Sequence, residues 1–480
     1  MRYGDRTVKS FRSCWLVLAA LMFVGSAIGQ TSQVSGSQTA QGTISAKAAT
    51  FEKKTHAVVG VSVVDAASGK PVAQYHQDDL FMPASNMKVV TTTAAMLRLG
   101  ADYQFKTTVY VLGNDVIVVG SFDPMLGDPV VAAEDKKSIY ADLDIWATAV
   151  KHQLGDKVGD VIVLTNRPVK TYRHADWPAN QYARWYSAPV AELDFNNNCI
   201  DVTFDADASG VTPVLSPSSK FFTVNNKLKA AKGAAWNLGL SNDDSVLTLT
   251  GTAARNATPQ PTAVNDPPML LARTFADRLE KIDVKVTGKI RSASASEIQL
   301  AKAAPVVQTT SPLTLAVRRC NKKSLNMAAE CLFLAAGDGT WEGSAHQETA
   351  TLTNDVGLKD TQFKIADGSG YSRNNRVSPA AMTTILCKAL AMKGSQSFVD
   401  SLPISGTDGS LEERIGGQYK GRVLGKTGYI AGVSCLSGFI LDKQGKPVYA
   451  YSILVNKNAD LTGARNMQAE ICESLVDSIK

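Results

Sequence analysis

Hydrophobic positions along this chain follow two periods, and the change of period marks where strands give way to helices. Residues 56–65 (HAVVGVSVVD) are dense in β-branched side chains, and a second strand-like run at 71–76 follows the turn at 66–70. From Ser85 to Leu99 the apolar residues instead recur at helical spacing, and the run stops before Gly100. The pattern therefore predicts a β-hairpin followed by a helix.

Short strands dominate the middle of the chain, and helices return in its last third. Strand-like runs separated by Asp, Gly, Pro and Asn turns fall at 106–112, 116–119, 161–164, 200–204 and 245–251. Helical patterns follow at 312–319, 326–336, 379–392 and 462–480, with a three-strand meander at 422–426, 435–442 and 448–456. This order predicts an α+β protein with a β-rich insert.

Length and charge narrow the class of protein. The 480 residues are 44% hydrophobic and 20% charged, an ordinary globular composition that allows roughly two to four domains. The formal charge of +6 is spread along the sequence without a run of five like charges, so a nucleic-acid partner is not expected. A solvated surface explains the positive excess most simply, and peripheral contact with an anionic membrane or wall surface stays open.

The N-terminal residues predict export. A basic stretch from Arg2 to Arg12 precedes the apolar run 14–24, and Ala27-Ile28-Gly29 resembles a small-residue cleavage site. We therefore expect a signal peptide at 1–29, cleaved near Gly29/Gln30, and a periplasmic or other extracytoplasmic location. Residues 30–47 are mostly polar and predict a flexible linker. Six cysteines remain, and both disulfides and buried thiols are open for them: Cys199, Cys320, Cys331, Cys387, Cys435 and Cys472.

The candidate chemistry begins at Ser85-Asn86-Met87-Lys88, the one Ser-x-x-Lys of the chain. Three residues apart on a helix, Ser85 and Lys88 share a face, so the amine can reach the hydroxyl. The dipole at the helix N-terminus favours a developing alkoxide, and an apolar setting would keep the amine partly neutral. Taken alone, the spacing is more often that of a solvated helix pair.

Two further motifs strengthen this interpretation. Ser324-Leu325-Asn326 opens an apolar helix, and Lys426-Thr427-Gly428 ends a strand of the C-terminal meander. In this order the three motifs match the S-x-x-K, S-x-N and K-T-G signature of penicillin-binding proteins and serine β-lactamases. A second S-x-N occurs at Ser372-Arg373-Asn374, but it lies in a loop rich in Gly and Asn, so Ser324 is preferred.

Together these motifs resemble the D-Ala-D-Ala carboxypeptidase/endopeptidase family of the penicillin-binding protein 4 type, over about residues 50–475. Further matching segments are 120–124 (GSFDP), 186–189 (YSAP), 367–373 (DGSGYSR) and 402–410 (LPISGTDGS). The resemblance implies a penicillin-binding/β-lactamase-like transpeptidase domain, an antiparallel sheet flanked by helices. This domain would comprise 48–105 plus 305–480, and 106–304 would be a β-rich insert of two subdomains.

The resemblance also implies an activity and its residues. A serine peptidase of this family cleaves peptidoglycan stem peptides, needs no cofactor and is inhibited covalently by β-lactam antibiotics. Ser85 would be the nucleophile and Lys88 its base, Ser324 would relay a proton to the leaving D-alanine, and Asn326 would hydrogen-bond Lys88 and the substrate backbone. The implied substrate-binding residues are Lys426, Thr427, Gly428 and Tyr429, with the N–H groups of Ser85 and Tyr429 as oxyanion hole. Ser369 would line the cleft floor or be an ordinary turn residue.

Two departures from the family pattern carry their own expectation. Tyr429 follows K-T-G where relatives usually place Thr or Ser, and 177–181 (WPANQ) lacks the acid that often follows Trp-Pro. Asn180 and Gln181 supply a dipole but no charge. The sequence therefore predicts that the enzyme depends less than its relatives on a free ammonium in the stem peptide.

Rival functions fit the sequence less well. Residues 192–196 (ELDFN) imitate the deacylating segment of class A β-lactamases, but Glu192 precedes S-x-N instead of following it. The five histidines form no Ser-His-Asp motif, and no H-E-x-x-H or paired Cys/His spacing predicts zinc. A wall-binding scaffold without catalysis is the remaining alternative, and the three intact motifs oppose it.

Overall fold

The structure, a computed structural model, describes residues 41–207 and 210–479, and a five-stranded antiparallel sheet holds its C-terminal part together. The strands across this sheet are β18 (Val423–Ile430), β19 (Val433–Leu441), β20 (Pro447–Asn456), β1 (Val58–Asp65) and β2 (Pro71–Tyr75). The predicted hairpin and the predicted meander therefore join in one sheet, because β1 pairs with β20 along its whole length. The prediction that Lys426-Thr427-Gly428 ends a strand is wrong, because the edge strand β18 continues past this motif to Ile430.

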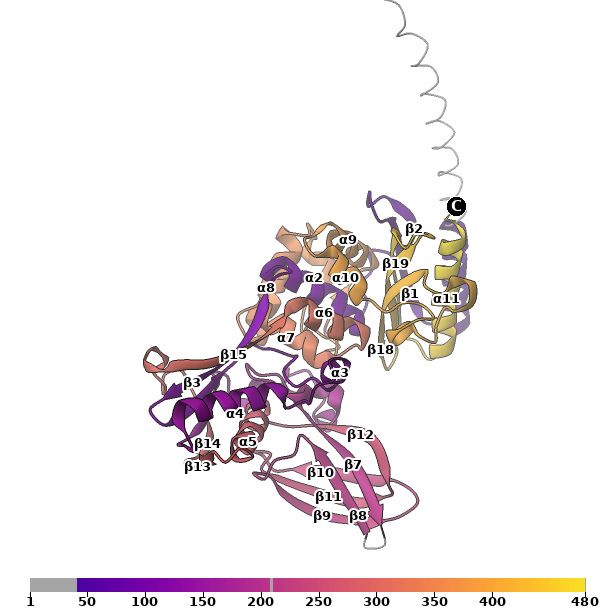
Figure 1. Cartoon of the computed structure of the whole chain (residues 1–480). Coiled ribbons are helices and arrows are strands. Elements are labelled where there is room, and N and C mark those ends of the chain that lie inside the picture. Colours follow the sequence, from indigo (N-terminus) through magenta and orange to yellow (C-terminus); the bar gives the residue numbers. More distant parts are fainter. Residues whose placement is uncertain (1–40, 208–209, 480) are drawn as a thin grey trace, which may run out of the picture.

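A helical layer covers one face of this sheet (Figure 1). Its helices are α2 (Met87–Leu99), α6 (Leu313–Lys322), α7 (Asn326–Ala336), α8 (Trp341–Asn354), α9 (Pro379–Ala391) and α10 (Ser395–Ser401). Helix α9 packs on β1 and β20, and α2 packs on α7. Residues 327–334 of α7 are all buried, which identifies α7 as a central helix surrounded by others.

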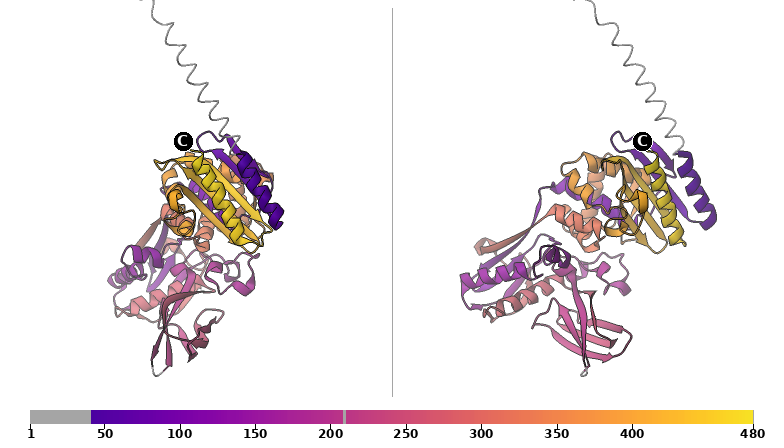
Figure 2. Two further views of the ribbon diagram at one scale, coloured as in Figure 1. Left: turned by 90° about the vertical axis from the view of Figure 1, so that its right-hand side faces the viewer. Right: turned by 45° about the vertical axis from the view of Figure 1, so that its right-hand side comes forward.

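The opposite face of the sheet is covered by α11 (Leu461–Asp477) and by helical residues 41–55, which lie beside each other in Figure 2. Ile44 and Ala48 are fully buried in the same apolar core as Ile471 and Leu475 of α11. The prediction of a flexible linker is therefore wrong for residues 41–47, whose few apolar side chains pack against the sheet. The predicted signal peptide and residues 30–40 lie outside the described residues.

The middle of the chain contains a second five-stranded sheet and two long helices. The strands in order are β14 (Ile290–Ala293), β6 (Val161–Leu164), β4 (Asp115–Val119), β3 (Gln104–Leu112) and β15 (Ala304–Pro312). Helices α4 (Ala141–Leu154) and α5 (Pro267–Glu280) share an apolar core with this sheet, and α3 (Pro129–Glu134) precedes them. The insert is thus less purely β than predicted. Buried Leu143, Trp146, Ala147 and Val150 had the spacing that marks a helix face.

A smaller β lobe extends from this sheet away from the helical layer (Figure 1). One of its sheets has the order β12 (Asn256–Ala263), β7 (Cys199–Asp207), β8 (Gly210–Ser216), and the other β10 (Ala235–Leu240), β11 (Val246–Ala253), β9 (Thr223–Ala230). Two-stranded pairs complete the described strands: β13 (Lys285–Val286) with β5 (Lys157–Val158), and β16 (Phe363–Lys364) with β17 (Arg376–Val377). The division at 105/106 and 304/305 stays a prediction; it falls at the first residues of the paired strands β3 and β15.

Candidate active site

Ser85 lies in a single 3-10 turn (Ala84–Asn86) that leads directly into α2. Two glycines from distant segments clamp this turn. A Cβ atom on Gly428 of β18 would lie 2.6 Å from the carbonyl oxygen of Pro83, and one on Gly370, whose φ is +81°, would overlap the carbonyl of Ala84. Only glycine permits so close a backbone approach. The turn that carries Ser85 is therefore fixed between β18 and the loop at 367–375.

Lys88 meets Ser85 as the spacing predicted. Its Nζ lies 3.0 Å from Ser85 Oγ, 2.7 Å from Asn326 Oδ1 and 2.9 Å from the carbonyl oxygen of Ser369. The side chain is fully buried. Burial lowers the pKa of Lys88, and the nearby acids Glu330 and Asp367 partly offset this shift. The amine lies within hydrogen-bond distance of Ser85 and can take a proton from it.

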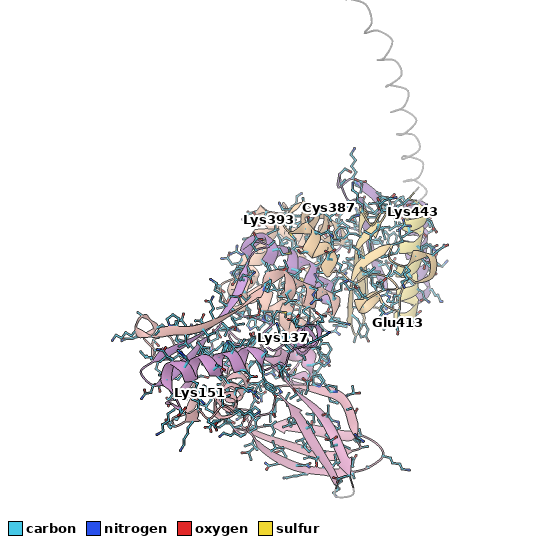
Figure 3. The ribbon with its side chains drawn as sticks, viewed as in Figure 1. Lys137, Lys151, Cys387, Lys393, Glu413 and Lys443 are labelled. Carbon is cyan, nitrogen blue, oxygen red and sulfur yellow. The ribbon has the colours of Figure 1, made fainter. Side chains whose placement is uncertain are left out.

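Lys426 and Ser324 form a second lysine–serine pair. Lys426 Nζ donates to Ser324 Oγ at 2.9 Å and to the carbonyl oxygen of Thr427 at 2.8 Å. Burial, and then the charge of Lys88, hold the pKa of Lys426 well below its usual value. Exposed lysines such as Lys393 and Lys443 in Figure 3 are the ordinary case for this side chain.

One member of each pair, Ser85 and Ser324, borders a cavity of about 850 Å³. Its walls are formed by Ser85, Asp176, Pro178, Asn180, Gln181, Trp185, Tyr186, Ser324, Asn326, Gly370, Tyr371, Arg373, Asn374, Tyr429, Ile430 and Ala431. The structure therefore brings the first two motifs and the residue after the third to a single space. Two hydroxyls and an amide on the cavity wall, each hydrogen-bonded to a buried amine, can perform acyl transfer through a covalent intermediate.

The predicted substrate-binding residues divide between two places. Thr427 Oγ1 donates to Ser410 Oγ at 2.7 Å and, with Gly428, borders a neighbouring hollow of about 310 Å³. Tyr429 is 57% exposed and borders both spaces. Ser369 is fully buried and does not line the cavity floor; its carbonyl oxygen instead accepts from Lys88.

The insert completes the cavity. Asn326 Nδ2 donates to the carbonyl oxygen of Tyr186 at 2.7 Å, so the S-x-N helix is tied to residues 185–187. Gln181 Oε1 accepts from the hydroxyl of Tyr371 at 2.6 Å and from that of Tyr186 at 3.2 Å. Trp177 Nε1 donates to Asp367 at 2.9 Å. The matched segments YSAP and DGSGYSR thus meet here, which their separation in the sequence did not reveal.

Asp176 is a cavity residue that the sequence analysis missed. Its Oδ2 accepts from Ser372 Oγ at 2.6 Å and from Asn374 Nδ2 at 2.8 Å, and the hydrogen bond from Ser372 is the main cause that lowers the pKa of Asp176. The acid that is absent after Trp177 is therefore present just before it. The second S-x-N motif, Ser372 to Asn374, holds this carboxylate and lies apart from Lys88.

Rival sites receive no support from the geometry. Glu192 Oε1 accepts only from the backbone N–H of Asn166, at 3.3 Å, and Glu192 is not part of the cavity wall. In residues 41–207 and 210–479, no three His, Cys, Asp or Glu side chains are grouped to hold a metal ion. The six cysteines for which disulfides were left open are all free thiols. Burial raises the pKa of one of them, Cys320, which lies near Lys88 and Lys426.

Comparison with known proteins agrees with this geometry. The D-Ala-D-Ala carboxypeptidase 3 (S13) family matches residues 40–475. The D-alanyl-D-alanine carboxypeptidase of Actinomadura sp. (strain R39) is 28% identical over 434 residues, 83% of this chain and 78% of that protein. The D-alanyl-D-alanine carboxypeptidase DacB of Haemophilus influenzae is 26% identical over 401 residues, 78% of this chain and 81% of that protein.

The fold is also found among solved structures. Penicillin binding protein 4 of Haemophilus influenzae superposes with a TM-score of 0.71 at 22% identity, covering 88% of this chain and 99% of that one. The same protein complexed with a β-lactam superposes with a TM-score of 0.67, again at 22% identity, covering 89% and 98%. The predicted fold class is thereby confirmed, and the family match over nearly the whole chain shows that this protein belongs to the D-Ala-D-Ala carboxypeptidase 3 (S13) family.

Proposed function

We propose that this protein is a serine-type D-alanyl-D-alanine carboxypeptidase/endopeptidase that cleaves peptidoglycan stem peptides through an acyl-enzyme on Ser85. One observation carries the proposal: the Ser85–Lys88–Asn326 contacts and the Ser324–Lys426 pair converge on one cavity. The family membership and the β-lactam complex of the Haemophilus protein support it. Carboxypeptidase and endopeptidase cleavage both break the bond after the same D-alanine, so the site suits either.

Acylation follows from the positions of the polar atoms. Neutral Lys88 takes the proton of Ser85 Oγ, which attacks the carbonyl carbon of the penultimate D-alanine. The N–H groups of Ser85 and Tyr429 would stabilise the oxyanion, a contribution of about 3–4 kcal/mol per donor in other hydrolases. Ser324, held by Lys426, relays a proton to the leaving amine as the C–N bond breaks. Water then hydrolyses the ester and regenerates Ser85.

Substrate binding divides between the two sides of β18. The positive potential of Lys426 and the hydroxyl of Thr427 would hold the terminal carboxylate of the leaving D-alanine. The stem peptide would lie in the larger cavity, where Asp176 supplies a negative charge near Asn180 and Gln181. We infer that this charge can attract a free ammonium of the stem, which revises the expectation of weak dependence.

Such a substrate requires a location outside the cytoplasmic membrane, where the predicted signal peptide would direct the chain. Within the described ranges, no helix combines the length and the apolar character needed to span a bilayer. Peripheral contact with the membrane surface stays a prediction.

Labelling with a fluorescent penicillin tests the proposal. The parent protein should form a covalent adduct, and Ser85→Ala and Lys88→Ala should each lose it while thermal unfolding remains cooperative, because the two residues act as one unit. A soluble peptide ending in D-Ala-D-Ala should release D-alanine with the parent only. Failure of the folded parent to form an adduct would leave the wall-binding scaffold as the better interpretation.

A further inference from the structure

Three buried carboxyl groups lie beneath the cavity and have no part in the steps above. They belong to Glu330 of α7, Glu348 of α8 and Asp367, with exposed fractions of 0%, 5% and 0%. A buried carboxyl group lowers stability unless it is hydrogen-bonded or paired with a cation. Each of the three therefore calls for an explanation.

Asp367 and Glu348 have different surroundings. Asp367 accepts from Trp177 Nε1 at 2.9 Å, from the N–H of Gly370 at 2.8 Å and from Asn375 Nδ2 at 2.7 Å, so it holds the cavity loop together. Glu348 has one long contact, 3.4 Å, with the hydroxyl of Thr91. Neither carboxyl group makes a hydrogen bond to Lys88 or to a group that binds Lys88 directly.

Glu330 connects to Lys88 through a single residue. Its Oε2 accepts from the N–H of Gly368 at 2.8 Å and its Oε1 from the N–H of Ser369 at 2.9 Å. The carbonyl oxygen of the same Ser369 accepts from Lys88 Nζ at 2.9 Å. Glu330 is also one turn after Asn326 on α7, whose amide oxygen binds Lys88. One helix thus supports the amine twice, directly and through Ser369.

Four ionisable side chains face Glu330, and one of them is a cation. They are Lys88 from α2, Asp367 from the loop at 367–375, Cys320 from α6 and Cys331 from α7 itself. Burial raises the pKa of both thiols, so they stay neutral. Burial, and then Asp367, hold the pKa of Glu330 well above its usual value, although the two N–H bonds and Lys88 oppose this shift. Because both oxygens already accept an N–H, the geometry suits the ionised carboxylate.

We propose that Glu330 is a positioning residue for the base: it fixes the carbonyl of Ser369 against Lys88 and faces the amine with a negative charge when Lys88 takes the proton of Ser85. Glu330 itself exchanges no proton in this step; the proton moves from Oγ to Nζ. In other nucleophilic sites, the general base that activates the nucleophile is likewise oriented by a third group. The proposal rests on the proposed function of Ser85 and Lys88.

The test is the pH dependence of acylation by a fluorescent penicillin, measured as a second-order rate constant. The rate should rise with pH as Lys88 becomes neutral. Removing the negative charge lowers the pKa of Lys88, so Glu330→Gln should move the rising limb about one pH unit towards acid. Its plateau should also fall about tenfold, because the Ser369 carbonyl loses its support. Glu330→Asp keeps the charge and should move the limb less than Glu330→Gln does.

Glu348→Gln is the matched control. It changes a buried carboxyl group of the same type that also contacts α2, but Glu348 is not among the groups that shift the pKa of Lys88. Its rising limb should coincide with that of the parent. A lower plateau with an unmoved limb in Glu330→Gln would overturn the proposal and leave a purely structural role.

Two safeguards separate the possible failures. If Glu330→Gln does not fold, Glu330→Asp decides: a shorter side chain withdraws the charge, so an unchanged limb and plateau would overturn the proposal. If the parent itself forms no penicillin adduct at Ser85, the proposed function fails. An adduct in the parent together with an unmoved limb in the variants refutes only the role of Glu330.

Discussion

Lys88 and Lys426 are fully buried amines, although lysine is almost never fully buried unless it is paired. Burial is the main cause that lowers the pKa of both, and neither forms an ion pair within 4.0 Å in the described part of the chain. A protonated amine in water could not accept the proton of a serine hydroxyl. The burial that lowers stability is therefore also what would let Lys88 act as the proposed base.

Glu348 offers a measure of what buried ionisable groups cost this fold. Burial raises its pKa to about 8, and the hydrogen bond from Thr91 lowers it only in part. An acid with a raised pKa in the folded state contributes stability below its unfolded pKa of about 4.3, which is lost as pH rises through the folded value. Glu348→Gln should therefore gain in Tm over the parent between about pH 5 and about pH 9. Thermal unfolding checks this, and a constant Tm difference would contradict it.

At the residue scale, the sequence identifies those site residues that lie close to one another along the chain. Ser85 and Lys88 share a helix face, and K-T-G lies within one strand, so both could be recognised before folding. Asp176, and the contact of Ser369 with Lys88, could not be recognised, because the partners Ser372 and Lys88 come from distant segments. For Glu330 a signal was available, since it follows Asn326 at i+4 on an apolar helix where a charged side chain needs a partner.

At the scale of elements, the site depends on a segment of the insert that packs against the helical layer. Residues 176–186 lie against α7 and the loop at 367–375 through Trp177, Gln181 and Tyr186. The apolar periods predicted helices α2, α6, α7, α9 and α11, because each buries one face or more. They missed α4 and α5 in the insert, where strand-like neighbours dominated the interpretation.

The segment at 176–181 predicts a substrate preference. The carboxylate of Asp176 is hydrogen-bonded in a form that favours the charged state, so it should attract a stem peptide with a free diamino-acid amine. Asp176→Asn should lower kcat/KM for that peptide more than for its acetylated analogue, and Gln181→Asp should enlarge the parent's preference. Equal losses on both peptides would show that Asp176 only supports the loop at 372–374.

At the scale of the whole molecule, one catalytic unit is assembled from the two ends of the chain, with the insert between them. The N-terminal hairpin completes the sheet begun by the C-terminal meander, and the helical residues 41–55 pack beside α11. The discontinuity followed from the positions of the motifs. The helix at 41–55 did not, because its sequence is mostly polar and only Ile44, Ala48 and Phe51 are buried in the core.

The β lobe formed by β7–β12 should be dispensable for the chemistry. It has an apolar core of its own, extends away from the helical layer (Figure 1), and provides none of the residues around the cavity. Replacing residues 203–259 by Asn-Gly would join the paired residues Val202 and Gln260 in a two-residue hairpin. This excision keeps Thr262 and Ala263, which bond to Arg184 and Ala183 beside the cavity wall.

Penicillin acylation of this shortened protein should stay within about threefold of the parent, because distant sites act independently. Its Tm should fall, since Leu270 and Arg273 of α5 lose the apolar cover and the contact with Asp243 that the lobe provides. Release of D-alanine from a soluble peptide and from intact peptidoglycan should then be compared. A larger loss on the polymer would assign the lobe to wall binding, whereas a folded excision variant that no longer reacts with penicillin would show that the lobe supports the active site itself.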